Sequence, residues 1–370
     1  MAEWFDCTIG DLCDTISDTY KGNDNKVVLV NTSDVLEGKV LNHTPVENTN
    51  LKGQFKKTFR KNDILFSEIR PANKRFAFVD FEDTSNYIAS TKLMVLRSND
   101  KVIPEFLFAI LKSETVLTEL QHLAETRSGT FPQITFSSEL APMKIKIPDK
   151  PTQRKIVSML SSIEQKMESN IAINNNLEQQ AFALFDSLFT RTIDGSQTIG
   201  DYINPKRGRN LLSKDAVYGT VPVVAGGLEP STYHNVANTK APVLTISASG
   251  ANAGFVNLWL NPVWSSDSSY IDSSMTPNVF FWYILLKGRQ KEIFDAQTGS
   301  AQPHIYPQHI AAMPIGNLNQ ESVSQFTTQV APLFELIGAN KDENERLRNI
   351  RDALLPRLMS GEIDVTDICI

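Results

Sequence analysis

Residues 156–188 read IVSMLSSIEQKMESNIAINNNLEQQAFALFDSL, and residues 326–358 read FTTQVAPLFELIGANKDENERLRNIRDALLPRL. In each stretch, steps of four and three residues connect mostly apolar positions into a seam, which is the heptad pattern of a coiled coil. The two seams coincide at one constant offset, and so do their polar positions, Asn170, Asn174, Asn340 and Asn344. Buried asparagines at such positions fix the register of paired helices. The stretches therefore predict two long coiled-coil helices, and two unrelated amphipathic helices are the weaker alternative.

Residues that break helices set the bounds of these two elements. Pro148 precedes the first helix and Asp-Gly-Ser at 194–196 follows it, which predicts a central spacer helix over 151–194. The same reasoning predicts a C-terminal spacer helix over 319–362, followed by a tail over 363–370.

The heptad pattern predicts which side chains lie in the coiled coil and at subunit interfaces. They are Ile156, Leu160, Ile163, Met167, Asn170, Asn174, Leu177, Leu184, Leu333, Ile337, Asn340, Asn344, Leu347 and Leu354. Two prolines, Pro332 and Pro356, fall inside the second pattern. Because proline removes a helical hydrogen bond and clashes with the preceding turn, we expect each to kink or locally break that helix.

The rest of the chain repeats itself as well. Thr-Ile-Gly-Asp at 8–11 recurs at 198–201. Gly-Thr-Phe-Pro-Gln-Ile at 129–134 is echoed by Gly-Ser-Ala-Gln-Pro-His-Ile at 299–305, and Leu-Ala-Pro-Met by Ile-Ala-Ala-Met, at 140–143 and 310–313. A repeat of this kind indicates two copies of one architecture. We therefore expect two globular domains, over 1–150 and 195–318.

Each domain has the pattern of an α+β globule whose helix comes late in the chain. The first shows short apolar strand patterns at 27–30, 64–66, 76–79 and 93–96, and a helical pattern at 104–123. The second shows strand patterns at 243–246, 254–260 and 270–271, and a helical pattern at 279–294. The predicted fold class is α+β, with two globular domains and two long helices.

Composition agrees with a soluble protein of two domains. The chain has 370 residues, of which 41% are hydrophobic and 21% charged, enough to bury more than one core. Its three cysteines, Cys7, Cys13 and Cys369, are odd in number and lack metal-ligand spacing, so neither a disulfide framework nor a zinc site is implied. No run reaches the ~18 apolar residues of a membrane span. We expect a cytoplasmic protein without a membrane partner.

Charge gives an ambiguous indication about nucleic acid. The net charge of -6 argues mildly against DNA, because phosphate binding depends on clustered Lys and Arg. Between residues 52 and 75, however, basic residues far outnumber acidic ones and phenylalanines are interleaved. This pattern fits a DNA surface, and it also fits a solvated face beside a strand pair.

No catalytic motif is complete. Asn-Pro-Val-Trp at 261–264 resembles the Asn-Pro-Pro-aromatic motif of adenine methyltransferases but lacks the second proline, and no glycine-rich turn for the methyl donor accompanies it. Residues 249–254 lack the Gly-Lys-Ser/Thr ending of a phosphate-binding loop and predict a tight turn between strands. The five histidines show neither metal-ligand nor triad spacing. The chain is predicted to bind rather than to catalyse.

Taken with the duplicated domains, three stretches resemble the specificity subunits of type I restriction-modification systems. They are the loop at 129–134 leading to Gln153-Arg154-Lys155-Ile156, the second loop at 299–305, and the terminal Leu-Leu-Pro-Arg-Leu-Met-Ser-Gly-Glu-Ile at 354–363. The resemblance covers the whole chain, and its last stretch is the most specific.

The resemblance implies a non-catalytic subunit that reads a bipartite target in double-stranded DNA. Each globule would be a target-recognition domain for one half, and the antiparallel helices would separate the halves and dock two adenine methyltransferase subunits. Restriction subunits would be further partners. No cofactor is expected in this chain, because S-adenosylmethionine, ATP and Mg²⁺ would be bound by partner subunits. A helix of about 40 residues measures roughly 60 Å, which can place two readers about one ~34 Å DNA turn apart.

DNA-contacting residues are predicted from charge and from the loops. The residues we favour are Lys56, Lys57, Arg60, Arg70, Lys74, Arg75 and Arg127 in the first domain, and Lys206, Arg207, Arg209, Ser249 and Asn252 in the second. The loops at Gly129 and Gly299 would approach the DNA backbone or serve as plain structural turns.

Two alternatives remain open at this stage. A coiled-coil scaffold or adaptor without DNA readout predicts no salt-sensitive DNA binding. A stand-alone methyltransferase using residues 261–264 predicts a bound methyl donor and activity from the isolated chain.

Overall fold

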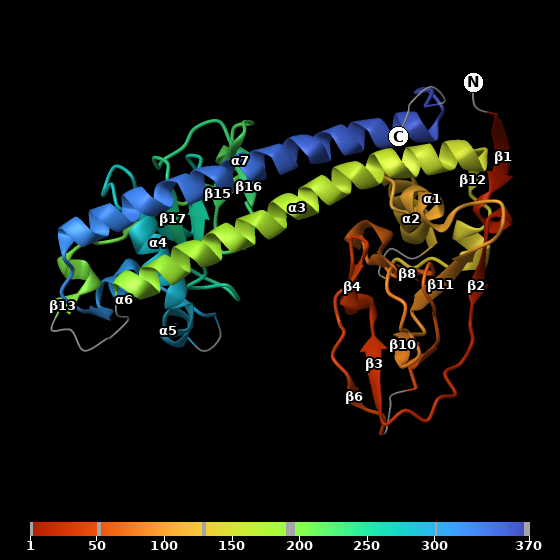
Figure 1. Cartoon of the computed structure of the whole chain (residues 1–370), viewed down its shortest axis with the longest axis horizontal. Coiled ribbons are helices and arrows are strands. Elements are labelled where there is room, and N and C mark those ends of the chain that lie inside the picture. The colour runs from red at the N-terminus through yellow and green to blue at the C-terminus, as the bar shows by residue number, and fades with distance from the viewer. Residues whose placement is uncertain (1–2, 50–52, 128–130, 190–196, 300–301, 366–370) are drawn as a thin grey trace. The chain divides into compact units, whose positions relative to one another are not determined.

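The computed structural model describes residues 3–49, 53–127, 131–189, 197–299 and 302–365. Close contacts divide the chain into two compact units (Figure 1). Unit 1 comprises Met1–Lys166 and Arg346–Ile370, and unit 2 comprises Met167–Glu345. Both units include part of each long helix, α3 (Lys150–Leu188) and α7 (Gln320–Met359). No described helix is long and apolar enough to span a membrane.

The long helices pair in an antiparallel manner, as the family resemblance implied. Within unit 2, the Asn170 amide donates to the Asn344 side-chain oxygen at 2.8 Å, and the Asn340 amide donates to the Asn174 side-chain oxygen at 2.8 Å. Later residues of α3 thus meet earlier residues of α7, which is the antiparallel direction. Within unit 1, Ile156 and Leu160 share a buried core with residues of the last turns of α7.

The expected break in the second helix is wrong, because α7 is continuous across Pro332 and Pro356. Both prolines lie on its exposed side. A proline in a helix costs ~3 kcal/mol, whereas burying a large apolar side chain gains roughly 1.5–3 kcal/mol. Val330 and Phe334, on either side of Pro332, are buried in the unit 2 core, so packing offsets the lost hydrogen bond.

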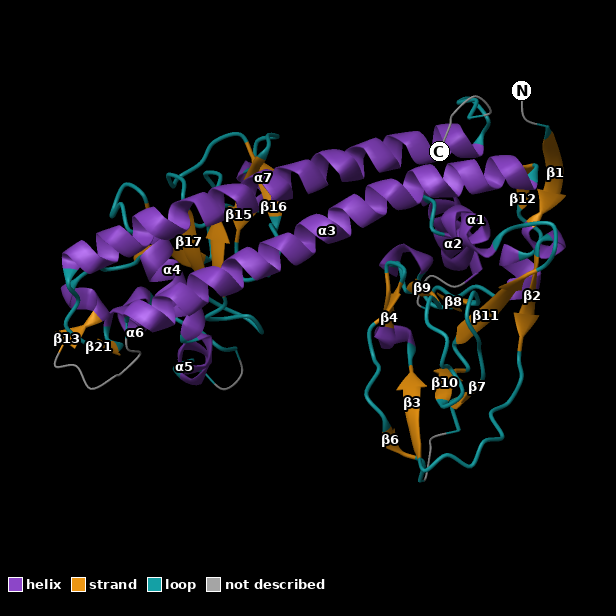
Figure 2. Ribbon diagram, viewed as in Figure 1, coloured by secondary structure: helices purple, strands orange, loops and turns teal. Residues whose placement is uncertain are grey.

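Unit 1 contains two four-stranded sheets and a pair of helices beneath α3 (Figure 2). The first sheet, β2-β11-β8-β9, is antiparallel and consists of Cys13–Ile16, Leu93–Ser98, Ile64–Ser67 and Phe76–Phe78. The second, β6-β3-β10-β7, consists of Val46–Glu47, Lys26–Val30, Tyr87–Ser90 and Phe55–Lys57, and β3 and β10 are parallel. Smaller pairs are β1 with β12, at Trp4–Thr8 and Lys144–Pro148, and β4 with β5, at Val35–Leu36 and Lys39–Val40.

The single helix predicted at 104–123 is wrong, because the structure contains two, α1 (Pro104–Leu111) and α2 (Glu114–Arg127). The chain turns at Ser113, whose hydroxyl accepts the Val116 amide at 3.4 Å and starts the second helix. Apolar side chains of α1 and α2 share one core with α3.

Unit 2 has a related architecture. Its antiparallel sheet, β14-β20-β17-β18, consists of Lys206–Arg207, Ser268–Asp272, Val243–Ser247 and Val256–Trp259. A second sheet, β16-β15-β19, consists of Thr232–His234, Val221–Val224 and Trp264–Ser265, and β13 pairs with β21 at Gln197–Thr198 and Pro314–Ile315. The helices are α4, α5 and α6, at Val279–Gly288, Gln290–Asp295 and Pro307–Ala311.

The single helix predicted at 279–294 is also wrong, since α4 and α5 are separated at Arg289. The Arg289 side chain is buried, forms an ion pair with Glu292 at 2.6 Å and donates to the Pro314 carbonyl at 2.9 Å. These contacts hold the chain in a non-helical conformation at that position.

The sequence repeats form equivalent contacts in the two units. Each Thr-Ile-Gly-Asp stretch makes a short 3-10 turn, η1 (Ile9–Asp11) or η5 (Ile199–Asp201), closed by a capping box from its threonine. The Ile9 amide donates to the Met143 carbonyl at 3.0 Å, and the Ile199 amide to the Met313 carbonyl at 2.9 Å. Two repeated motifs therefore contact each other in both copies, which confirms the predicted duplication.

The remaining short turns are η2, η3, η4 and η6, at Thr32–Asp34, Pro71–Asn73, Phe136–Leu140 and Ser213–Asp215.

Candidate nucleic-acid interface

The basic stretch of unit 1 contains two kinds of side chain. Some are exposed to solvent, and others donate hydrogen bonds to backbone carbonyls of the same unit. Lys56, on β7, and Arg60, which follows it, are exposed. Phe59 between them is buried in the core of the same unit, which anchors this segment to the sheet. Lys56 and Arg60 are therefore available to a polyanion.

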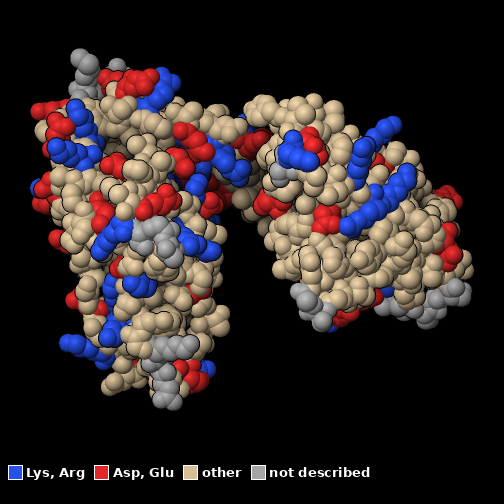
Figure 3. Space-filling model, turned by 180° about the vertical axis from the view of Figure 1, so that it is seen from behind, with Lys and Arg blue, Asp and Glu red and all other residues tan. Residues whose placement is uncertain are grey.

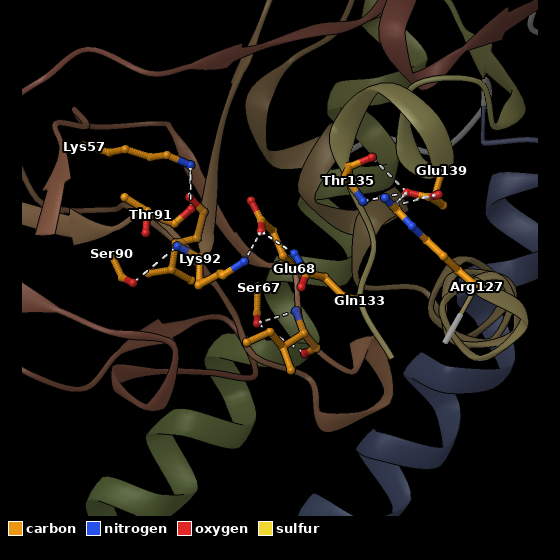
Figure 4. Close-up of polar contacts among 12 residues, drawn as sticks. Lys57, Ser67, Glu68, Ser90, Thr91, Lys92, Arg127, Gln133, Thr135 and Glu139 are labelled. Carbon is orange, nitrogen blue, oxygen red and sulfur yellow. Dashed lines mark hydrogen bonds and ion pairs between the residues drawn. The ribbon is translucent and has the colours of Figure 1, made fainter. Parts of the chain in front are cut away.

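Lys57 is directed into the protein instead. Its ammonium donates to the backbone carbonyls of Thr91 and Leu93 at 3.1 and 2.8 Å (Figure 4). Partial burial lowers the pKa of this amine. The contacts join β7 to the start of β11 and to the residue two positions before it, and they give Lys57 a structural role within the fold.

Arg75 also donates to backbone carbonyls. Its guanidinium donates to the carbonyls of Ser33 and Val35 at 3.0 and 3.4 Å. It ties the residue before β9 to the turn before β4 and to the first residue of β4, so only part of its donor capacity is left for a ligand.

Arg70 and Lys74 delimit the turn that connects β8 to β9. Both have left-handed backbone conformations, with φ of 44° and 52°. The Arg70 side chain is exposed, as is that of Asn73, a residue that charge patterning did not single out. Lys74 lies 3.6 Å from the Glu114 carboxylate, an exposed pair of little energetic weight.

A polar network lies beside this turn (Figure 4). The Glu68 carboxylate is 3.6 Å from the Lys92 ammonium and accepts the Gln133 side-chain amide at 3.0 Å. Gln133 belongs to the first repeat loop, of which Gly129 lies outside the described residues. The network joins that loop to the end of β8.

Arg127, at the end of α2, is exposed and lies 3.2 Å from Glu139. Glu139 also accepts the backbone amide and hydroxyl of Thr135, at 2.6 and 3.0 Å (Figure 4). Arg127 therefore helps to close the base of the repeat loop, and its exposed half faces solvent.

In unit 2 the predicted basic cluster is exposed and small. Lys206 and Arg207 form β14, at the edge of the main sheet, and Arg209 follows them. Arg207 forms an ion pair with Asp267 at 2.6 Å. The visible face of unit 2 in Figure 3 carries few Lys and Arg side chains between wide uncharged areas.

Ser249 and Asn252 lie in the turn between β17 and β18, which confirms the tight turn predicted there. The Ser249 hydroxyl donates to the Asp267 carboxylate. The Asn252 side chain is half-buried. Gly250 and Gly254, at the two ends of this turn, have φ of 80° and 87°. Gly299, in the second repeat loop, also has a positive φ, of 93°.

The methyltransferase-like stretch has a structural role. Asn261 is exposed and Trp264 donates its indole N–H to the Arg209 carbonyl at 2.8 Å. Trp264 also packs edge-on against His234. Among the described residues, no group of His, Cys, Asp or Glu is arranged to hold a metal ion.

The chain was compared with known families and proteins. A family model described as the type I restriction modification DNA specificity domain matches residues 1–179. The HindI specificity subunit of Haemophilus influenzae is 30% identical, over 98% of this chain and 100% of that protein. The chain belongs to the specificity subunits of type I restriction enzymes.

More distant relatives are also specificity subunits. The MjaIX specificity subunit of Methanocaldococcus jannaschii is 26% identical, over 73% of this chain and 71% of that protein. The crystal structure of the type I restriction-modification S subunit from M. genitalium has a TM-score of 0.56 at 20% identity, over 97% of this chain and 96% of the other, which supports the fold.

The specificity subunit is thus a non-catalytic, DNA-recognising component of a type I restriction-modification system. Its partners, in general terms, are DNA and the methyltransferase and restriction subunits of such a system. The adaptor alternative is not supported.

Proposed function

We propose that the specificity subunit reads a bipartite target in double-stranded DNA, with each unit reading one half. The observation that carries this proposal is the duplication: both units repeat the capped Thr-Ile-Gly-Asp turn and its hydrogen bond to the Leu-Ala-Pro-Met or Ile-Ala-Ala-Met stretch. A protein with two copies of one reader multiplies the specificity of each, provided that the readers are joined.

The paired helices α3 and α7 are the proposed spacer and the docking site for two methyltransferase subunits. A helix of 39 residues, such as α3, measures on the order of 60 Å. S-adenosylmethionine, ATP and Mg²⁺ would be bound by the partner subunits, in agreement with the lack of a complete catalytic motif in the sequence. Native mass spectrometry of the co-expressed complex is expected to give two methyltransferase subunits per specificity subunit, and a ratio of one would contradict this stoichiometry.

The exposed basic residues are the proposed DNA contacts. In unit 1 these are Lys56, Arg60 and Arg70, with Lys74 and Arg127 at its margin, and in unit 2 Lys206, Arg207 and Arg209. Lys57 and Arg75 are left out, because backbone carbonyls already hold their charged groups.

A salt titration of DNA binding tests this assignment, with the complete methyltransferase complex and a fluorescent duplex carrying its target. Replacing Lys56 and Arg60 by alanine is expected to weaken binding. The plot of log K against log salt should also become less steep, with the magnitude of its negative slope reduced by ~0.9 for each lost phosphate contact. Lys57→Met is the matched control, since it removes a charge from the same strand.

The two variants should differ in their melting temperatures and in their salt slopes. Lys57→Met is expected to lower the melting temperature but to leave the salt slope unchanged, because its amine contacts the protein rather than DNA. An unchanged slope in the Lys56 and Arg60 variant would remove this patch from the interface. Sequencing of N6-methyladenine in DNA from cells that express the complex tests the wider proposal, and a contiguous rather than split motif would contradict it.

A further inference from the structure

We propose that two turns, Arg70–Lys74 in unit 1 and Gly250–Gly254 in unit 2, are equivalent base-reading elements, one for each half of the DNA target. This inference rests on the proposed function and specifies which residues distinguish bases. It starts from a second level of duplication, which appears in the hydrogen bonds of the structure and not in the sequence.

The first shared feature is a hydrogen bond from the repeat loop to the end of a central strand. In unit 1 the Ile134 amide donates to the Glu68 carbonyl at 2.8 Å. In unit 2 the Ile305 amide donates to the Ala248 carbonyl at 2.9 Å. Each repeat loop is thus fixed at the point where β8 or β17 ends and the turn begins.

The second shared feature is a hydrogen bond in the opposite direction. The Arg70 amide donates to the Pro132 carbonyl at 3.2 Å, and the Gly250 amide donates to the Pro303 carbonyl at 3.1 Å. The loop and the turn therefore hold each other by two bonds in both units. This brace fixes the first residue of each turn.

The third shared feature is the shape of the turn. The Asn73 amide donates to the Arg70 carbonyl at 2.9 Å, and the Ala253 amide donates to the Gly250 carbonyl at 3.0 Å. The first and last residues of both turns have positive φ, of 44° and 52° in unit 1 and 80° and 87° in unit 2. Position by position, Arg70 corresponds to Gly250, and Ala72 to Asn252.

One copy keeps side chains where the other has glycine. Glycine adopts the left-handed region without strain, whereas residues with a Cβ adopt it at a cost. Arg70 and Lys74 carry this cost although the turn of unit 2 is built with Gly250 and Gly254. Strained positions that persist in a braced turn point to a role for the side chains.

The side-chain chemistry of the two turns suits base edges. Arg70 is exposed, and an arginine pairs with the O6 and N7 atoms of guanine through two hydrogen bonds. Asn252 occupies the other turn, and an asparagine pairs in the same manner with the N6 and N7 atoms of adenine. We therefore expect a guanine in the half-site read by unit 1 and an adenine in the half-site read by unit 2.

Phosphate anchoring explains the turns less well. An anchor common to both half-sites would use the same cationic chemistry in each copy. The turn of unit 2 reads Gly-Ala-Asn-Ala-Gly and has no charged residue, whereas the turn of unit 1 reads Arg-Pro-Ala-Asn-Lys. A constant backbone with different side chains is what two readers of different sequences require.

The test exchanges single residues between the two turns. Arg70→Gly introduces the residue of the other turn at this position, and Asn252→Ala introduces the equivalent of Ala72. Both substitutions fit the backbone already present, so folding should be preserved, and melting curves check this. Arg70→Lys keeps the charge but cannot form the bidentate pair. Lys146→Ala, at an exposed position on β12, is the control for loss of one charge.

The readout is the methylation motif of each variant, co-expressed with its methyltransferase subunit and determined by sequencing N6-methyladenine. Arg70→Gly and Arg70→Lys should each relax one guanine in one half of the motif, raising methylation at the wrong base roughly 5- to 150-fold. Asn252→Ala should relax one adenine in the other half. Lys146→Ala should keep the wild-type motif.

Three results would overturn the inference. The first is an unchanged motif in the Arg70 and Asn252 variants, and the second is a uniform loss of methylation without altered base preference. The third is an equal relaxation by Lys146→Ala. The proposed function fails separately, if the wild-type complex itself yields no split motif.

Discussion

The asparagine pair between α3 and α7 allows a quantitative test of how the helix register is fixed. The Asn170 amide nitrogen donates to the Asn344 side-chain oxygen at 2.8 Å, and Asn170 and Asn344 are 0% and 8% exposed. Replacing one of them by leucine removes this bond and leaves a buried polar atom of the other facing an apolar side chain. The remaining amide keeps its second bond, to Glu343 for Asn170 or to the Met167 carbonyl for Asn344. Replacing both creates an apolar contact in the seam.

The expected magnitudes follow from this geometry. An unsatisfied buried polar group costs ~1–3 kcal/mol, and burying leucine recovers part of it. We expect Asn170→Leu and Asn344→Leu each to lower the free energy of unfolding by about 1 kcal/mol. The double variant should be about 1 kcal/mol more stable than the wild type, because polar seam residues fix register at a cost in stability. The coupling free energy between the two sites is therefore about 3 kcal/mol.

Calorimetry of the four proteins measures this coupling. A change of 1 kcal/mol shifts the melting temperature of a unit of this size by roughly 2–4 °C. Asn175→Leu, at an exposed position of α3, is the control and should stay within ~0.5 kcal/mol of the wild type. If the change in the free energy of unfolding of the double variant equals the sum of the two single changes within ~0.5 kcal/mol, the two side chains are not coupled. That result would refute the role of this pair in fixing the helix register.

Three further predictions concern the fold. A Cβ at Gly10 would meet the neighbouring alanine Cβ at 3.0 Å. Gly10→Ala should therefore destabilise unit 1 by about 1–3 kcal/mol, while Gly53→Ala, with no atom within 4 Å, should be neutral in the same denaturant titration. Burial raises the pKa of the Cys13 thiol to about 12, so this thiol should resist a thiol reagent at pH 8 until the chain unfolds; peptide mapping that finds the label on Cys13 in the folded protein would contradict this. Asp63 is 1% exposed and paired with an arginine at 2.7 Å, so Asp63→Ala should cost about 3 kcal/mol in denaturant unfolding, and a loss below 1 kcal/mol would contradict it.

The long helices and the duplication were predictable because their determinants are local or repeated. A heptad seam is visible within one stretch, and the coincidence of Asn170 with Asn340 requires no knowledge of the fold. The helix boundaries at Ser113 and Arg289 were missed because the apolar pattern continues across both breaks. What interrupts each helix is a side-chain contact, with Val116 in one case and with Glu292 in the other.

For the proposed DNA surface, the sequence indicated the basic segment but not which of its side chains are free to contact a ligand. Lys56 and Lys57 are adjacent in the sequence and chemically identical, yet one is exposed and the other donates to two backbone carbonyls. Their different positions follow from the alternation of side chains along β7 and from the Thr91 and Leu93 carbonyls, which lie within reach of only one of the two ammonium groups. A count of charged residues shows neither the direction of a side chain nor the groups that it contacts.

The two base-reading turns were hidden from sequence comparison for a physical reason. Glycine at 250 and 254 predicts a tight turn, but arginine and lysine at 70 and 74 do not, because side-chain-bearing residues rarely adopt left-handed conformations. The turns are also offset by a different number of residues than the helices. Only the hydrogen bonds reveal the correspondence.

The same correspondence shows that the charge beside the turn differs between the two units. The Glu68 amide donates to the Lys92 carbonyl at 3.0 Å, and the Ala248 amide donates to the Asp267 carbonyl at 3.1 Å, so Lys92 and Asp267 occupy equivalent positions. One copy thus places a cation beside its turn, and the other an anion that is neutralised by Arg207. Because the backbone brace is unchanged, each unit is free to vary the charge beside its turn without altering the turn. The proposed reading of two half-sites of different sequence requires this separation of scaffold from chemistry.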